Sequence, residues 1–207
     1  MTALVTLVRH GRTAHNAAGR FQGWADVPLD EHGRTQAQSV ARRLASHATR
    51  PTQVLSSDLQ RAAQTAHAIA APLGLTPHPT PALREIHIGA WEGLTFAEIE
   101  ARDSAGFQAW PVRGAPQGES LHEVGARVRG VLDRLTLNSD GHVVIVTHGV
   151  AITALLCDVL GWDPQDTWRA RRGLHDNTAL TTLQRHGPGE WTCDVLACAE
   201  HLTLTLS

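Results

Sequence analysis

The run Arg9-His10-Gly11 ends a short apolar stretch, Leu4–Val8, and places a nucleophilic side chain beside a cationic one. A histidine ring can attack phosphorus through one nitrogen, and a neighbouring arginine can hold phosphoryl oxygens. The tripeptide alone is weak evidence, because a second copy, Arg185-His186-Gly187, leads into the turn pair Pro188-Gly189. We therefore expect the chemistry at the first copy and a hairpin turn at the second.

The absence of lysine narrows the chemistry further, since all 18 basic residues are arginine. Phosphate-loop NTPases, whose glycine-rich loop ends in lysine, and Schiff-base mechanisms are thereby excluded. A phosphate site in this chain has to be built from arginine, histidine and backbone N–H groups. The planar guanidinium suits this role because it bonds two phosphate oxygens at once.

Alternating strand and helix patterns surround these residues. Short apolar runs predict buried strands over Leu4–Val8, Gln53–Ser56 and His142–Val146. Apolar residues at helical spacing, with signals for helix ends, predict helices over Glu31–Ala48, Leu59–Ala71, Glu119–Leu137 and Val150–Leu160. A short helix should begin at Thr95, with Glu98 completing a capping box, and the proline-rich run Thr76–Pro81 should be a loop.

The C-terminal part has a different pattern. Thr178–Gln184 and Trp191–Ala197 should form a hairpin closed over His186-Gly187-Pro188-Gly189. We therefore predict a single α/β domain over residues 1–207, a three-layer α/β/α sandwich with a largely parallel central sheet and a C-terminal antiparallel hairpin. Its pocket should lie beyond the carboxyl ends of the strands. Three segments at strand ends should meet there: Arg9-His10, Ser56-Ser57-Asp58 and Thr147-His148.

Composition excludes several other classes of protein. The net charge of -2 argues against a nucleic-acid binder, and no apolar run reaches membrane-spanning length or resembles a signal peptide. Cys157, Cys193 and Cys198 are too few and too scattered for a disulfide framework or a thiolate zinc site, and we expect small buried side chains in a cytoplasmic protein. We expect no metal site, since the other histidines are scattered and should lie at surface or helix positions. These are His15, His47, His67 and His201.

Ordered blocks along the chain are similar to the histidine phosphatase (phosphoglycerate mutase-like) superfamily. They are Arg9-His10-Gly11-x-Thr13-x-x-Asn16, Phe21-Gln22-Gly23-Trp24-x-Asp26-x-Pro28-Leu29, Gly33-Arg34-x-Gln36-Ala37, Ser56-Ser57-Asp58-Leu59-x-Arg61-x-x-x-Thr65-Ala66, Leu83-Arg84-Glu85-x-x-x-Gly89-x-Trp91-Glu92-Gly93, Gly118-Glu119-Ser120 and Val146-Thr147-His148-Gly149. The resemblance spans residues 4 to about 180. A single block could be an accident, whereas seven in the family's order are strong evidence.

The resemblance implies a metal-independent phosphohydrolase without a cofactor, in which His10 is the nucleophile and carries a phosphohistidine intermediate. One ring nitrogen of His10 should attack phosphorus, and the other should donate to a backbone carbonyl that fixes the tautomer. Arg9, Arg61 and His148 should surround the phosphoryl oxygens, and Glu85 should be the general acid.

Further residues are implied on the phosphate side. Asn16 should add a neutral donor, and Gln22, Gly23 and Gly149 should complete the phosphate site. His87 could line the substrate side or be structural. Asp58, Glu92 and Glu119 are the rival carboxylates for the role given to Glu85.

Two departures from family patterns bear on the reaction. The mutases resemble Asn-Glu-Arg-His-Tyr-Gly around the acid and use a downstream lysine, whereas here Ile86 follows Glu85 and lysine is absent. The stretch between Gly93 and Gly118 is also shorter than the mutase insertion that covers the site, which favours hydrolysis over transfer. Arg12 stands where the family often has glutamate, and we expect it beside the pocket mouth, favouring multiply charged substrates.

The substrate should be a small phosphorylated metabolite, and the chain is most similar to the bacterial broad-specificity phosphatases. A cofactor-dependent phosphoglycerate mutase, an α-ribazole phosphatase, a sugar-phosphoglycerate phosphatase and a non-catalytic phosphate-binding module stay open as alternatives. The presence of His10, Glu85 and His148 together disfavours the binding module. A homo-oligomer also stays open.

Overall fold

A six-stranded sheet forms the centre of the protein in the computed structural model, which describes residues 3–137, 141–187 and 189–205. The strands lie in the order β3-β2-β4-β1-β5-β6. Their bounds are β1 Ala3–Arg9, β2 Gln53–Ser56, β3 His78–Pro79, β4 His142–Thr147, β5 Leu180–Gly187 and β6 Glu190–Cys198. Strands β1 to β4 run parallel to one another, whereas β5 pairs antiparallel with both β1 and β6. The largely parallel sheet and the C-terminal antiparallel hairpin are thus confirmed.

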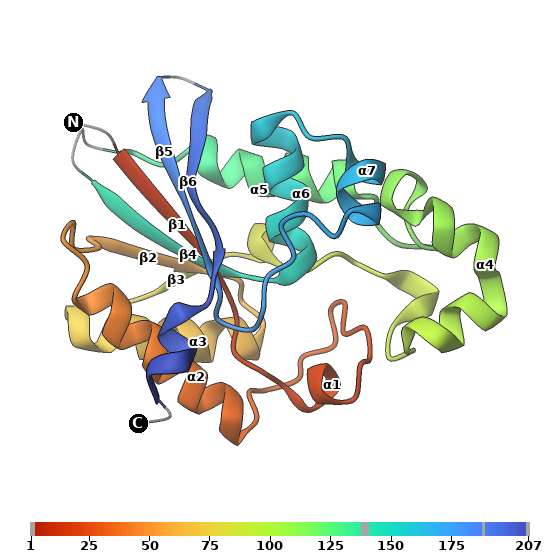
Figure 1. Ribbon diagram of the computed structural model, residues 1–207, viewed down its shortest axis with the longest axis horizontal. Coiled ribbons are helices and arrows are strands. Elements are labelled where there is room, and N and C mark those ends of the chain that lie inside the picture. The colour runs from red at the N-terminus through yellow and green to blue at the C-terminus, as the bar shows by residue number, and fades with distance from the viewer. Residues whose placement is uncertain (1–2, 138–140, 188, 206–207) are drawn as a thin grey trace.

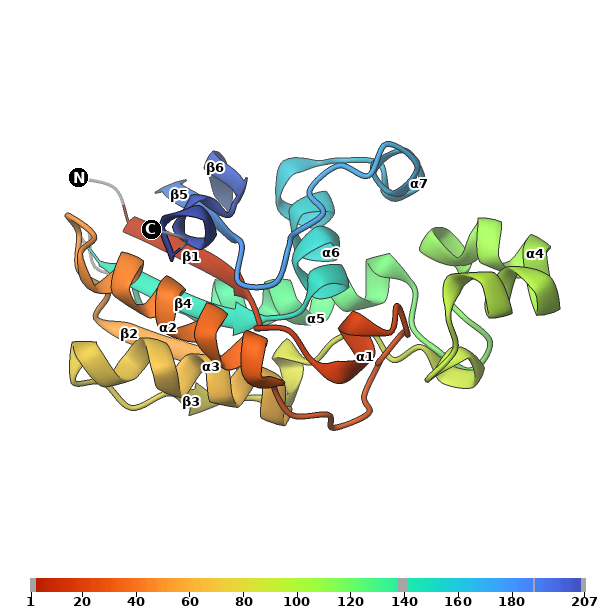
Figure 2. The same ribbon diagram turned by 60° about the horizontal axis from the view of Figure 1, so that its bottom comes forward.

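Helices cover both faces of this sheet (Figures 1 and 2). On one face lie α2 (Glu31–Ala45) and α3 (Gln60–Ala70), and on the other lie α5 (Leu121–Asp133) and α6 (Gly149–Leu160). The sheet is buried between them, so every residue of β4 is buried, as expected for a central parallel strand. The predicted three-layer sandwich is confirmed.

The remaining elements are short or irregular. They are α1 (Ala14–Ala17), α4 (Phe96–Arg113), α7 (Pro164–Arg169) and the 3₁₀ turns η1 (Ala71–Leu73), η2 (Pro81–Leu83), η3 (Gly89–Trp91) and η4 (Glu200–Thr205). Helices α4 and α7 lie together beyond the carboxyl ends of the parallel strands (Figure 1). They form a cap beside the place where the predicted pocket should open.

The structure corrects several predicted bounds. The capping box of Thr95 and Glu98 is present, but the helix that follows is long, with a break at Asp103 where the backbone is not helical. The run Thr76–Pro81 contains the two-residue strand β3, which proline tolerates because it lies at the sheet edge. Helix α5 begins after Ser120 and ends at Asp133, so its predicted span was too long at both ends.

The second Arg-His-Gly copy is also placed differently from the prediction. His186 and Gly187 are the last residues of β5, so they belong to the strand and not to the turn. His186 is exposed and contacts Thr192 across the hairpin. Pro188, which we expected in that turn, lies outside the described residues.

Candidate active site

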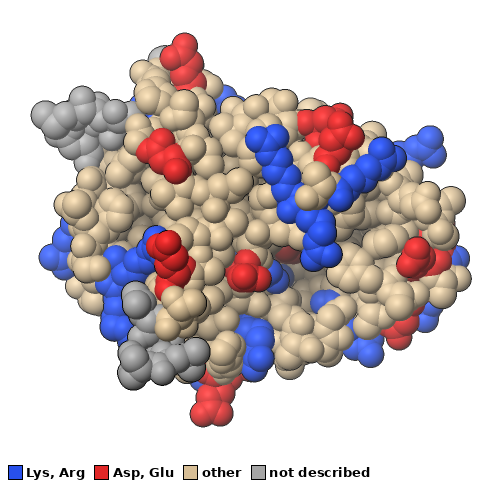
Figure 3. Space-filling view, viewed as in Figure 1, with Lys and Arg blue, Asp and Glu red and all other residues tan. Residues whose placement is uncertain are grey.

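A pocket of about 290 Å³ opens where β1 and β4 end, at the side of the sheet that faces α4 and α7. Figure 3 shows this hollow, with basic side chains on its rim and in its depth. Four arginines line it: Arg9, Arg20, Arg61 and Arg171. Such a concentration of positive charge suits an anionic ligand.

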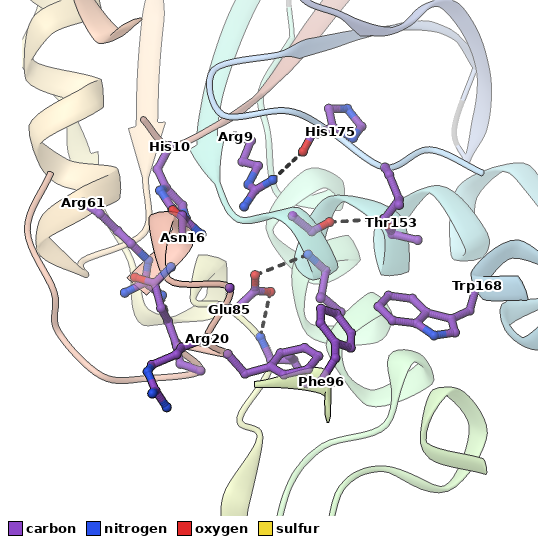
Figure 4. Close-up of a pocket in the computed structure, with 18 of the residues that line it drawn as sticks. Arg9, His10, Asn16, Arg20, Arg61, Glu85, Phe96, Thr153, Trp168 and His175 are labelled. Carbon is purple, nitrogen blue, oxygen red and sulfur yellow. Dashed lines mark hydrogen bonds between the residues drawn. The ribbon is translucent and has the colours of Figure 1, made fainter. Parts of the chain in front are cut away.

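His10 follows directly after β1 and is almost fully buried at the inner end of the pocket (Figure 4). Its Nδ1 lies 2.7 Å from the carbonyl oxygen of Gly11, which can only accept, so Nδ1 carries the proton. The Nε2 atom therefore keeps its lone pair. Burial, followed by the charges of Arg61 and Arg9, holds the pKa of His10 well below its ordinary value of 6.5. The ring is thus neutral and able to attack at neutral pH.

Close backbone packing fixes the loop that carries this histidine. The Gly11 N–H donates to Thr65 Oγ1 on α3 at 3.0 Å. A methyl group on Gly11 would collide with the carbonyl of Gly33 in the first turn of α2. This contact requires glycine at position 11 and explains why the residue after His10 has no side chain.

His148 follows β4, and its ring meets the ring of His10 edge-on at a centroid distance of 5.1 Å. Its Nδ1 accepts a hydrogen bond from Arg61 Nε at 3.2 Å, so the proton resides on Nε2. That Nε2 is buried and has no partner among the described residues. Burial and the charge of Arg61 lower the pKa of His148 well below 6.5, which leaves a neutral ring with one free N–H donor.

Arg61 projects from the first turn of α3 and is completely buried. It donates to the carbonyls of Gly23 at 2.8 Å and Ala25 at 2.7 Å. Two of its N–H groups are therefore bonded to the loop that contains Gly23 and Ala25. Burial is the main reason that its pKa falls to about 10, which still leaves it protonated at neutral pH. Arg61 therefore orients His148 and the loop as well as lining the pocket.

Arg9 enters the pocket from the end of β1. Its Nη1 donates to the backbone carbonyl of His175, and its Nε has no partner among the described residues. Burial lowers its pKa, while the charges of Glu85 and Asp176 oppose that shift. Gly149, at the start of α6, lies against this guanidinium and also lines the pocket.

Asn16 and Gln22 both line the pocket, and the amide oxygen of each accepts a hydrogen bond from Thr13. Thr13 donates to Asn16 Oδ1 from its backbone N–H at 3.2 Å and to Gln22 Oε1 from its hydroxyl at 2.9 Å. Among the described residues, neither amide nitrogen has a hydrogen-bond partner, so both can donate to a ligand in the pocket. Gly23 has φ of 51°, and a side chain there would meet Ile88 and Glu92.

Glu85 is the one carboxylate among the pocket-lining residues that the structure describes. Its Oε1 accepts from the backbone N–H of Ala151 at 3.0 Å, and its Oε2 accepts from that of Val150 at 3.3 Å. Both donors belong to the first turn of α6. The carboxylate thus stands opposite His10 with its position fixed by the helix.

The rival carboxylates have other partners and do not line the pocket. Asp58 forms an ion pair with Arg84 at 2.6 Å, and Glu119 forms one with Arg127 at 2.8 Å. Glu92 accepts from the backbone N–H groups of Trp24 and Ala25. These three carboxylates therefore hold the loops around the site in place.

Three other residues considered in the sequence analysis do not line the pocket. Arg12 does not line the pocket and forms an ion pair with Asp30 at 2.8 Å. The prediction that Arg12 adds a positive charge at the pocket mouth is therefore wrong. His87 packs edge-on against Trp24 outside the pocket. For His87, this packing supports the structural role, one of the two that the sequence left open. His201, expected at a surface or helix position, lies in the 3₁₀ turn η4, where it is buried and contacts Thr178 Oγ1.

Sequence reasoning missed two residues of the loop before β5. The Asn177 side-chain amide donates to the backbone carbonyl of His10 at 3.0 Å and to Asn16 Oδ1 at 3.2 Å. His175 supplies the carbonyl that holds Arg9. Topology is the signal that could have found them, because the start of an antiparallel strand beside β1 lies at the carboxyl end of β1.

Comparison with known proteins decides the family. The sequence model of the histidine phosphatase superfamily, branch 1, matches residues 5–199. The chain belongs to this superfamily. The resemblance drawn from the ordered sequence blocks is confirmed.

The relatives of this histidine phosphatase include a named phosphatase and a probable mutase. The glucosyl-3-phosphoglycerate phosphatase of Mycobacterium tuberculosis is 36% identical over 210 residues, which cover 92% of each chain. The probable phosphoglycerate mutase GpmB of Yersinia pestis is 39% identical over 163 residues, covering 76% of this chain and 74% of the relative. A solved mycobacterial glucosyl-3-phosphoglycerate phosphatase in complex with VO3 has a TM-score of 0.85 at 34% identity, covering 95% of this chain and 99% of that one.

Two further features concern metal binding and membrane insertion. Within the described ranges, no group of three or more histidine, cysteine or carboxylate side chains is arranged to hold a metal ion. In the same part of the chain, no helix combines the length and apolar character that crossing a bilayer requires.

Proposed function

We propose that this protein hydrolyses phosphomonoesters of small metabolites by transferring the phosphoryl group first to His10 Nε2 and then to water. The observation that carries the proposal is the state of His10. Its Nδ1–H is fixed on Gly11, its pKa is depressed, and its free Nε2 is at the inner end of a pocket lined by cationic and neutral donors.

The first half of the reaction forms a bond between Nε2 and phosphorus and breaks the bond between phosphorus and the ester oxygen. Arg9, Arg61 and the free Nε2–H of His148 are the donors for the phosphoryl oxygens, and the amides of Asn16 and Gln22 add neutral donors. Glu85 gives its proton to the leaving oxygen as the bond breaks.

The second half returns the enzyme to its starting state. Water attacks phosphorus while Glu85 takes up one of its protons, and the electron pair of the phosphorus–nitrogen bond returns to Nε2. One carboxylate therefore serves as acid and then as base, and inorganic phosphate leaves. The match to the histidine phosphatase superfamily supports a histidine as the residue that carries the phosphoryl group.

For the substrate, the relatives favour one of the alternatives that the sequence left open. The glucosyl-3-phosphoglycerate phosphatase covers nearly the whole chain, which supports a sugar-phosphoglycerate or a related phosphorylated acid. We further propose a cytoplasmic location, which the free cysteines Cys157, Cys193 and Cys198 favour.

A mutase is the second candidate, because the GpmB relative is named a probable phosphoglycerate mutase. The two reactions differ in what accepts the phosphoryl group from His10. Purified protein supplied with 3-phosphoglycerate, and 2,3-bisphosphoglycerate to charge His10, should release inorganic phosphate. Formation of 2-phosphoglycerate faster than phosphate release would establish the mutase, and no turnover even of p-nitrophenyl phosphate would indicate a binding module.

A further inference from the structure

The pocket continues outward into a second cavity of about 240 Å³, which we call the outer subsite. Four residues line it, and all four also line the main pocket: Phe96, Trp168, Arg171 and Leu174. Phe96 and Trp168 lie across the pocket from His10 and Arg61 in Figure 4. A phosphoryl group bound at His10 therefore directs the rest of its ester toward the outer subsite.

The walls of the outer subsite are large apolar side chains that are left exposed. Phe96 is 49% exposed and Leu174 is 39% exposed. The Phe96 ring is supported by Phe21 at a centroid distance of 4.4 Å, and the Trp168 ring by Trp110 at 4.6 Å. Exposed aromatic side chains that are held in place offer a surface to a ring on the ligand.

Arg171 is the one cation of the outer subsite, and its guanidinium has no hydrogen bond or ion pair with any part of the chain that the structure describes. Its backbone N–H alone is bonded, donating to the carbonyl of Trp168 at 3.1 Å. Its neighbour Arg172 differs, since that guanidinium lies 3.6 Å from the centroid of the Trp162 ring. No carboxylate lines the outer subsite within the described residues. The charge of Arg171 is therefore available to a ligand.

The backbone at Arg171 adds a second observation. The residue follows α7 with φ of 53°, a left-handed conformation in which glycine is favoured at helix ends. Position 171 nevertheless carries a long cationic side chain over the pocket. This placement is understandable if the guanidinium itself has a role at the pocket.

We propose that the outer subsite binds a single carboxylate carried by the leaving group, with Arg171 as its partner and the aromatic walls against a ring. The preferred substrate is then a phosphomonoester whose alcohol bears both a ring and an acid group. This inference rests on the proposed function, since it assigns the far end of the same substrate. A planar guanidinium matches a carboxylate geometrically, and one unpaired cation matches one negative charge.

A matched pair of esters tests the proposal. The probes are 3-(4-phosphonooxyphenyl)propanoate and its primary amide, which share the ring and the length but differ in the charge. The unaltered protein should hydrolyse the carboxylate with a kcat/KM roughly tenfold or more above that of the amide, mainly through KM. Arg171→Gln should bring the ratio near one, and Arg171→Lys should retain part of it.

Two further variants separate the proposal from general charge and from misfolding. Arg169→Gln removes the same charge from the neighbouring turn of α7, but Arg169 lines a different surface groove, so the preference should stay. Arg171→Gly should lose the preference while its thermal unfolding midpoint holds or rises, because glycine relieves the left-handed backbone.

The outcomes distinguish the subsite from the reaction. A ratio near one in the unaltered protein, or an unchanged ratio in Arg171→Gln, would overturn the outer subsite, provided that p-nitrophenyl phosphate is hydrolysed. If the protein hydrolyses none of the three esters (the carboxylate, its amide and p-nitrophenyl phosphate), the proposed function on which the subsite rests would be overturned instead.

Discussion

The proposed chemistry depends on which nitrogen of each histidine carries the proton. His10 and His148 have opposite tautomers, because Gly11 accepts from one and Arg61 donates to the other. One ring thus offers a lone pair and its neighbour offers an N–H. The sequence could indicate both histidines from their motifs, but the partners that fix the protons come from segments far away in the chain.

Glu85 offers a quantitative test at this scale. A general acid matters most for a poor leaving group, since an alkoxide needs a proton as the bond breaks and p-nitrophenolate barely does. General acid catalysis is typically worth 10²–10⁴-fold, or about 3–5 kcal/mol. Glu85→Gln should therefore slow phosphorylation by roughly that factor with an alkyl phosphate and far less with p-nitrophenyl phosphate. Burst kinetics isolate that step, and equal losses for both substrates would remove Glu85 from the role.

Metal dependence is a second test of the residues. Arg9 and Arg61 line the pocket and bring the positive charge that metal ions supply in other phosphatases. We expect turnover to persist in EDTA, and we expect vanadate to inhibit by mimicking the five-coordinate transition state. Activity lost in EDTA and restored by zinc or magnesium would contradict the mechanism.

At the scale of elements, the ends of two strands and the first turns of two helices form the site. The ends of β1 and β4 bring His10 and His148, the first turn of α3 brings Arg61, and the first turn of α6 holds Glu85. Strand and helix patterns predicted these four elements well, because each has a continuous apolar core face. They predicted α4 poorly and missed α7, although Asp163 before Pro164 is a helix-start signal that could have been read.

The loop before β5 gives a prediction at this scale. Asn177 donates to the carbonyl of His10 and to Asn16, so it fixes the amide nitrogen of Asn16 toward the pocket. Asn177→Ala should lower kcat/KM about threefold to tenfold and weaken vanadate inhibition similarly, with a small change in stability. Asn177→Asp keeps the volume but cannot donate, so it should do no better than alanine. Activity near normal in the aspartate variant would show that Asn177 acts only through packing.

For the whole molecule, the largely parallel sheet and its two covered faces follow from the alternation of strand and helix patterns, which is why the α/β sandwich could be predicted. The outer part of the molecule could not be predicted, since α4 contains Pro111 and a break at Asp103, and the positions of the Phe96 and Trp168 rings depend on tertiary contacts. The single-domain assignment stays a prediction. The unusual global property is a set of buried histidines held neutral: His10, His142, His148, His175 and His201.

Those histidines make stability depend on pH. Burial lowers the pKa of His175 to about 4, so below pH 6.5 the unfolded chain binds a proton that the folded chain does not. Its contribution to stability is therefore complete above pH 6.5 and is lost as the pH falls toward 4, by about 3 kcal/mol. Urea unfolding from pH 7.5 to 4.5 should show this decline, and His175→Gln should make it shallower. Identical slopes for the two proteins would exclude the assignment.

The formation of phosphohistidine at His10 is the central claim, and trapping tests it most directly. A reaction with a labelled phosphomonoester, stopped with base during turnover, should leave label on His10 in a bond that is base-stable and acid-labile. His10→Ala should lose both label and turnover, whereas His186→Ala, in the exposed second copy of the tripeptide, should keep both. Label on another residue, or undiminished turnover in His10→Ala, would contradict the account.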